Sequence, residues 1–95
     1  MEAGKSIQEF LEFVIAGLIE ARDKASITHR EEGNGRLIFD IRLEDEDVGR
    51  IVGKNGYVIS SIRSLADAAA EKHNVRVRIR LHSLSEEGEA REVRE

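Results

Sequence analysis

Two segments of the chain alternate apolar with mostly polar residues, and the stretch between them has a different spacing. The first alternating segment spans residues 37–43 and the second spans residues 75–81. Alternation with a period of two predicts β-strands with one buried face. Residues 48–52 and 58–70 instead place apolar side chains three or four positions apart, which predicts two helices. Because a crossover of this length lets the two strands run parallel, we expect them to be neighbours in one sheet, joined by a right-handed connection.

The first part of the chain predicts one helix and one further strand. Ser6 and Glu9 have the spacing of a capping box, and apolar residues at helical spacing follow them, so we expect a helix over residues 6–22. The segment 25–30 is short and partly β-branched, and the glycine and asparagine residues within 31–35 suit a hairpin turn. We therefore expect the short segment to pair antiparallel with the strand that follows it.

Together these segments predict an α+β fold with the element order α-β-β-α-α-β and a three-stranded mixed sheet. Only one face of each strand is apolar, so all three helices should cover the same face of the sheet. The opposite face is expected to expose six polar side chains to solvent: Arg36, Asp40, Arg42, Arg76, Arg78 and Arg80.

Charge is distributed unevenly along the 95 residues, whose formal net charge is -4. Residues 1–49 carry a net charge of -6, residues 50–82 carry +5 and residues 83–95 carry -3. We therefore expect one domain over residues 1–82, followed by an acidic C-terminal tail over 83–95. Because the local field decides where an anionic partner docks, such a partner should meet the segment 50–80.

Composition argues against several other classes of protein. The absence of cysteine excludes disulfides and thiolate metal sites. The longest apolar run, Phe13 to Ile19, has seven residues, whereas a membrane span needs about 20. The N-terminus has no basic region before an apolar stretch, so we expect no export signal, no membrane association and a cytoplasmic location. His29, His73 and His82 show no metal-ligand spacing, and we expect neither a metal nor another cofactor.

Catalysis is not indicated either. Residues 49–55 match a phosphate-binding P-loop only in part, because the first glycine is one residue too close and Asn55 replaces the serine or threonine that would hold magnesium. Ser60 and Ser61 have no histidine nearby in the sequence to act as a base. We therefore expect a protein without catalytic residues.

The segment Gly53-Lys54-Asn55-Gly56 separates the two helical patterns between the strands. Glycine has no Cβ, so it allows another backbone to approach closely. The segment also precedes a helix, where unpaired N–H groups and the helix dipole favour an anion. Lys54 adds a positive charge, and Arg50 lies one turn earlier. These features predict a site that holds a sugar-phosphate backbone close to the protein.

The run around this segment, IVGKNGYVISSI at residues 51–62, resembles the KH-domain signature, in which apolar residues flank a G-x-x-G loop with one basic x. The expected element order resembles the bacterial form of this fold, called type II. Over about residues 7–82 the chain is similar to the small bacterial single-KH RNA-binding proteins of the KhpA family. The similarity is carried by four stretches: 11–16, 47–56, 62–63 and 68–70. The chain departs from the family pattern in lacking a proline after the first helix and in its acidic tail.

The resemblance implies non-catalytic binding of single-stranded RNA in a narrow cleft between the two central helices and the strand that follows. Carried over to this chain, the two loop glycines would let RNA approach, and Lys54 and Asn55 would meet phosphate or ribose. Tyr57 adds a ring on which a base could stack. The apolar floor beneath the bases would come from Val48, Val52 and Ile59. The expected RNA-binding residues are therefore Arg50, Val52, Gly53, Lys54, Asn55, Gly56, Tyr57 and Ile59.

The family resemblance further implies an RNA chaperone or post-transcriptional regulator that pairs with itself or with a second KH-containing protein. The alternative is a protein–protein adaptor that has the same fold but does not bind RNA. The acidic total charge and the acidic tail favour the adaptor, whereas the basic local segment and the intact loop favour RNA.

Overall fold

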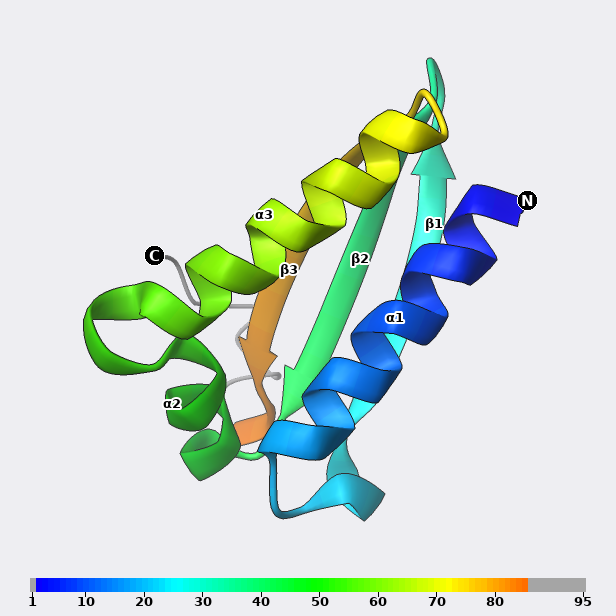
Figure 1. Ribbon diagram of the computed structural model, residues 1–95. Helices are drawn as coiled ribbons and strands as arrows, with labels where there is room; N and C mark the ends of the chain where they lie inside the picture. Colours follow the sequence, from blue (N-terminus) through cyan, green and yellow to red (C-terminus); the bar gives the residue numbers. More distant parts are fainter. Residues whose placement is uncertain (1, 86–95) are drawn as a thin grey trace.

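Helices and strands follow one another in the predicted order α-β-β-α-α-β (Figure 1). The structure is a computed structural model that describes residues 2–85. The predicted tail falls mostly on residues 86–95, which lie outside the described residues. The helices are α1 (Glu2–Leu18), α2 (Asp45–Val52) and α3 (Tyr57–Lys72); the strands are β1 (Ser26–Glu32), β2 (Arg36–Leu43) and β3 (Arg76–Ser83); two short 3-10 turns are η1 (Arg22–Lys24) and η2 (Lys54–Gly56).

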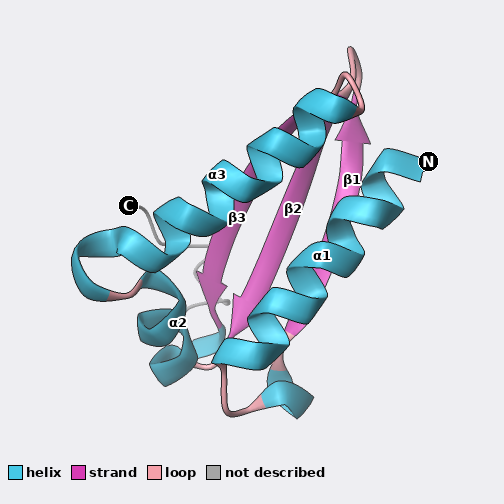
Figure 2. Cartoon of the chain, in the orientation of Figure 1, coloured by secondary structure: helices cyan, strands magenta, loops and turns pink. Residues whose placement is uncertain are grey.

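The three strands form one mixed sheet in the order β1-β2-β3. Strand β1 pairs antiparallel with β2, with Ser26 opposite Arg42, and β2 pairs parallel with β3, with Arg36 beside Arg76. Helices α1 and α3 lie across one face of the sheet, and α2 lies at the end where β2 and β3 finish (Figure 2). The predicted parallel pairing through a two-helix crossover is therefore confirmed, as is the fold of a three-stranded mixed sheet with three helices.

The hydrophobic core lies between this face of the sheet and the helices. The odd-numbered residues of β2 point into it, and Phe39 at its centre has no exposed surface. Apolar side chains at helical spacing on α1 pack against these β2 residues, and Leu11 among them is fully buried. Burial of each large apolar side chain contributes roughly 1.5–3 kcal/mol, so this layer accounts for much of the drive to fold.

Helix α1 begins and ends four residues earlier than predicted. Ser6 does not cap the helix, because it lies inside α1 and is exposed. The buried stripe extends one turn towards the N-terminus to Ala3, which is 3% exposed, and the helix near Gly4 packs so closely that an added Cβ would lie 2.7 Å from Nε2 of His29. Burial of this extra turn outweighs the local capping signal.

The face of the sheet opposite the helices is less exposed than predicted. Arg36, Arg76 and Arg78 are exposed as expected, whereas Arg42 and Arg80 are half-buried. Asp40 is only 6% exposed, so its predicted exposure is wrong. The carboxylate of Asp40 accepts a hydrogen bond from Arg30 and contacts Nε2 of His82, each at 2.9 Å, and Nε of Arg80 lies 3.8 Å away. Burial by itself would raise the pKa of this carboxyl, but the hydrogen bond and charge of His82 and the charges of the two arginines lower it overall.

Asp47 joins α2 to the end of α1. The predicted acidic first turn of α2 is confirmed, but Asp47 turns inward and is 1% exposed. Its two oxygens accept hydrogen bonds from the backbone N–H groups of Glu20 and Ala21, both at 3.0 Å, and Oδ1 accepts another from Arg50 at 2.6 Å. The backbone bond from Glu20 is the main cause that holds the pKa of Asp47 below its ordinary value, with the Ala21 and Arg50 bonds adding to it against the opposing effect of burial.

Replacing this carboxylate should destabilise the protein in a pH-dependent way. The folded-state pKa of Asp47 is lowered, so the ionised group stabilises the fold above its unfolded pKa of about 3.9. That contribution is lost as the pH falls through the lower folded-state pKa. We expect Asp47→Asn to unfold at lower urea than the natural sequence at pH 7, and the difference to shrink below about pH 4.

The matched control is Glu46→Gln, which removes an exposed carboxylate from the same helical turn. It should leave the urea midpoint nearly unchanged at pH 7. Equal losses in the two variants would contradict the role assigned to Asp47.

Candidate nucleic-acid interface

The four-residue loop between α2 and α3 has an unusual backbone. Gly53 ends α2 with φ 74° and ψ 178°, and Gly56 precedes α3 with φ 75°. Between them Asn55 also has a positive φ of 56°. The turn is closed by backbone hydrogen bonds from Gly53 to Gly49 at 2.9 Å and from Gly56 to Gly53 at 3.1 Å. The sequence therefore places glycine or asparagine at each of the three loop positions with a positive φ, where those residues cost least.

Gly53 is required by packing as well as by its dihedral angle. A Cβ built on Gly53 would lie 2.3 Å from Cγ2 of Val58 and 3.1 Å from the backbone nitrogen of that residue. The end of α2 thus lies directly against the first turn of α3. Sequence reasoning placed Val58 only among the apolar positions of the helix, and its spacing alone carries no sign of this contact.

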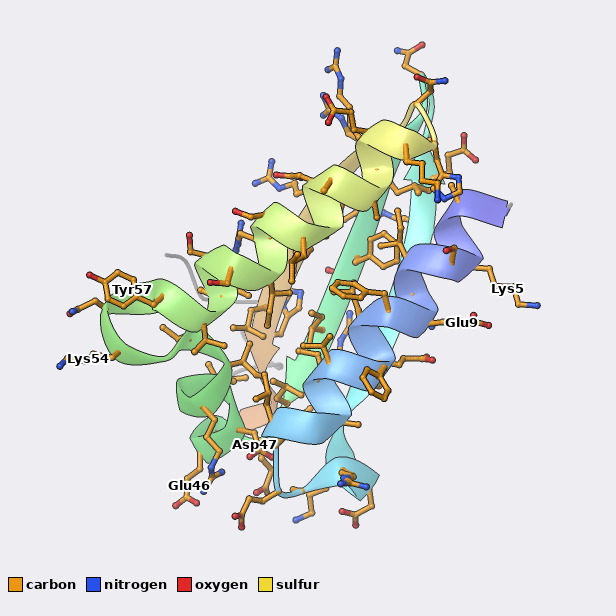
Figure 3. The ribbon with its side chains drawn as sticks, viewed as in Figure 1. Lys5, Glu9, Glu46, Asp47, Lys54 and Tyr57 are labelled. Atoms are coloured by element: carbon orange, nitrogen blue, oxygen red, sulfur yellow. The ribbon has the colours of Figure 1, made fainter. Side chains whose placement is uncertain are left out.

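The start of α3 lies beside exposed side chains. No side chain caps this N-terminus, and the N–H of Tyr57 is bonded to the carbonyl of Lys54. Lys54 and Asn55 are exposed and Tyr57 is 66% exposed. Lys54 and Tyr57 project outward from the loop, on the opposite side of the molecule from Lys5 (Figure 3). This arrangement offers one cation, one aromatic ring and the positive end of the helix dipole to an approaching anion.

The other predicted site residues are placed differently. Arg50 is held by Asp47 rather than by the loop, although its side chain remains 41% exposed. Val52 is half-buried beside the loop, whereas Ile59 is fully buried in the core and Val48 is 8% exposed. Of the three residues predicted to form the apolar floor, only Val52 therefore keeps substantial exposed surface. Ile59 instead packs in the core beneath the first turn of α3.

A shallow groove runs between the second half of α3 and the start of β3. It is lined by Ser64, Asp67, Ala68, Ala70, Glu71, Val75, Arg76 and Val77. None of the predicted site residues lines it. Its helical side carries two carboxylates and its strand side carries one arginine, so the groove is not uniformly basic.

Two of the three histidines, His29 and His82, make side-chain contacts within the fold. The ring of His29 packs on Phe39 with 5.0 Å between centroids, and His82 contacts Asp40. Within residues 2–85, no group of three histidine, cysteine or acidic side chains could hold a metal ion. The same part of the chain has no helix that is both long and apolar enough to span a bilayer.

Two helices joined through G-x-x-G, set between parallel strands in the order α-β-β-α-α-β, define a type II KH domain. A family model described as "KhpA/KhpB, KH domain" matches residues 8–81. The chain belongs to this family of KH domains.

Curated relatives agree with this assignment. The RNA-binding protein KhpA of Borreliella burgdorferi is 34% identical over 80 residues, covering 84% of this chain and 95% of that protein. The proteins of the same name from Chlamydia pneumoniae and Clostridium perfringens are 31% and 32% identical, covering 79% and 75% of this chain and 95% and 93% of their own lengths. The relatives are named for RNA binding and not for an enzymatic activity, in agreement with the expected absence of catalysis.

Adding one methyl group at Gly53 should destabilise the domain. We expect Gly53→Ala to lower the free energy of unfolding by about 1–3 kcal/mol, because the new Cβ overlaps Val58 and the positive φ disfavours alanine. Combining it with Val58→Ala should recover part of the loss, with a coupling of at least about 0.5 kcal/mol in a double-mutant cycle measured by urea unfolding.

Gly17→Ala is the matched control for this substitution. Gly17 lies in α1, and a Cβ added to it would meet no neighbouring atom within 4 Å. Alanine there should therefore be neutral or stabilise by up to about 1 kcal/mol. Similar effects at the two glycines would refute the close contact between the loop and α3.

Proposed function

We propose that this protein binds single-stranded RNA through the loop Gly53–Gly56 and the first turn of α3. The observation that carries the proposal is the start of α3, which no side chain caps. Beside it lies the exposed Lys54, in a loop that begins and ends with glycine. A phosphate group there would accept hydrogen bonds from backbone N–H groups and lie near the positive end of the helix dipole. The name of the relatives, RNA-binding protein KhpA, supports the same class of ligand.

The distribution of charge around the loop supports a polyanion despite the acidic net charge. The acidic residues of α2 lie in its first turn, and Asp47 is already neutralised by Arg50 and two backbone N–H groups. An eight-residue helix is about 12 Å long, so these carboxylates lie well away from Lys54. A phosphate bound at the loop would thus lie closer to the ammonium group of Lys54 than to the carboxylates in the first turn of α2.

Bases would be held beside the loop rather than by a large aromatic platform. Tyr57 offers an exposed ring for one base, and Val52 offers a half-buried apolar surface. A module of this kind clamps roughly four nucleotides, so we expect modest affinity and weak sequence selectivity. These properties suit an RNA chaperone or a post-transcriptional regulator. The cytoplasmic location predicted from the sequence remains a prediction.

Pairing would join two weak sites and raise avidity. We therefore retain the predicted association with a second copy or with another KH-containing protein. Phe13 on α1 is 82% exposed and lies on a different element from the loop, so an apolar contact there would leave the loop free. Light scattering over a dilution series should show a mass that falls towards the 10.7 kDa monomer if the chain pairs with itself.

The exposed Phe13 and the net charge of -4 also favour the rival function, a protein–protein adaptor without RNA binding. RNA titration separates the two functions directly. Binding of a labelled single strand at several salt concentrations should give a log–log slope of roughly -1.5 to -2, for two or three phosphate contacts. An adaptor would show no saturable binding at any of these salt concentrations.

Placing two carboxylates in the loop should remove RNA binding without unfolding the protein. We expect Lys54→Asp with Asn55→Asp to abolish saturable binding, because both positions are exposed and would repel phosphate. Circular dichroism and urea unfolding would check that the fold is retained.

The matched control is Lys5→Asp with Asn34→Asp, which makes the same change in charge away from the loop. Asn34 has a φ of 61°, close to the 56° of Asn55, so the backbone cost is also matched. The control should retain most of the affinity. Unchanged RNA affinity in a folded loop variant would exclude the loop as the binding site.

A further inference from the structure

The face of the sheet opposite the helices is a regular array of arginines. Side chains that point to one face recur at every second residue of a strand, and paired residues point the same way. The register therefore gives four rows across the sheet: Glu32, Arg36 and Arg76; Arg30, Ile38 and Arg78; Thr28, Asp40 and Arg80; Ser26, Arg42 and His82. We call these twelve residues the arginine face. Its formal charge is +4 with histidine neutral, in a chain whose net charge is -4.

The centre of the arginine face is shielded from water although no described helix covers it. Ile38 is 3% exposed, Asp40 is 6% exposed and the side chain of His82 is 12% exposed. Arg30 and Arg78 flank Ile38 on the two neighbouring strands. A partly dry centre with cations around it strengthens ion pairs with an anionic chain laid across it, because the local dielectric constant is lower than in water.

The chain leaves the fold at one end of the sheet. Ser83 ends β3, and the hydroxyl of Ser83 donates to Asp45, which also accepts a hydrogen bond from the Ser85 hydroxyl at 2.7 Å. These bonds hold the last described residues at the same end of the sheet as Arg42 and His82. The ten residues that follow span up to about 33 Å when extended, and an eight-residue strand is about 26 Å long. The remaining chain is therefore long enough to cross the whole face.

We propose that the acidic C-terminal segment 86–95 docks on the arginine face of its own chain. This segment has five glutamates and two arginines, a net charge of -3 that complements the charge of the face. Its tether raises the effective concentration to the millimolar range, which favours it over free polyanions of similar charge. The family match ends at residue 81, so the segment lies outside the matched KH domain. The proposed docking does not depend on RNA binding at the loop.

Paramagnetic labelling of the full chain tests this docking. The sequence has no cysteine, so Val93→Cys creates a single site for a nitroxide within the acidic segment and leaves its charges unchanged. We expect the side-chain Nε–Hε signals of Arg36, Arg76 and Arg78 to lose more than half of their intensity relative to the reduced label. The signals of Arg22 and Arg50, which lie off the arginine face, should keep most of theirs.

Two charge variants of the labelled protein test the cause. Replacing all five glutamates of the segment by glutamine should restore the three arginine signals, whereas Arg91→Gln with Arg94→Gln should leave them broadened. A change on the face itself, Arg76→Gln with Arg78→Gln, should weaken the broadening of Arg36. The control variant Lys5→Gln with Lys72→Gln also loses two positive charges, but it should leave the broadening of Arg36 unchanged.

Four results would overturn the proposal. Equal broadening on and off the arginine face would mean that the segment has no preferred site. Broadening centred on the amides of residues 53–57 would place it on the loop instead. Equal broadening of enriched chains without a nitroxide, when mixed with nitroxide-labelled chains of natural isotope abundance, would assign the contact to a second copy. Broadening that survives the five substitutions would exclude an electrostatic cause.

Discussion

The close contact between Gly53 and Val58 determines the geometry of the candidate site. With no Cβ on Gly53, the end of α2 comes against the first turn of α3, and the intervening loop is pushed outward. Lys54 and Tyr57 then project into solvent while Ile59, two residues further on, is fully buried. The same contact therefore exposes the helix N-terminus and anchors it to the core. A bulkier residue at position 53 would alter both together.

Two buried carboxylates show why the net charge of the chain does not describe the field at its surface. Asp47 is satisfied by two backbone N–H groups and Arg50, and Asp40 by Arg30, His82 and Arg80. Neither carboxylate is free to repel a polyanion at the surface. Net charge counts them fully, whereas the local field at the loop depends on exposed groups nearby. The value of -4 is thus a poor guide to which ligands the protein binds.

Periodicity predicted the element order and the strand pairing, because both depend on repeated apolar positions. The family was indicated separately, by the resemblance of the residues around the glycine pair to the KH signature. Periodicity could not predict how far side-chain contacts between elements would bury a given residue or shift a helix end. Ser6 carried a valid capping signal, yet burial of Ala3 one turn earlier decided where α1 begins. Asp40 had the pattern of an exposed strand residue, and only the neighbouring strands supply the partners that bury it. Arg50 was assigned to the loop by sequence proximity, but its nearest carboxylate, on Asp47, lies on its own helix.

The loop and the arginine face are separate cationic surfaces, and this separation bears on how RNA binding should depend on salt. The loop lies beyond the β3 side of the sheet, while the arginine face lies behind the sheet, opposite α1 and α3 (Figure 1). If both surfaces bound RNA, the slope of affinity against salt would reflect many more phosphates than the loop can contact. An acidic segment docked on the arginine face would neutralise that surface and leave the loop as the main cationic site. The docked segment would then limit non-specific RNA binding, because it competes with RNA for the arginine face. It would leave RNA binding at the loop unaffected, because it does not contact the loop.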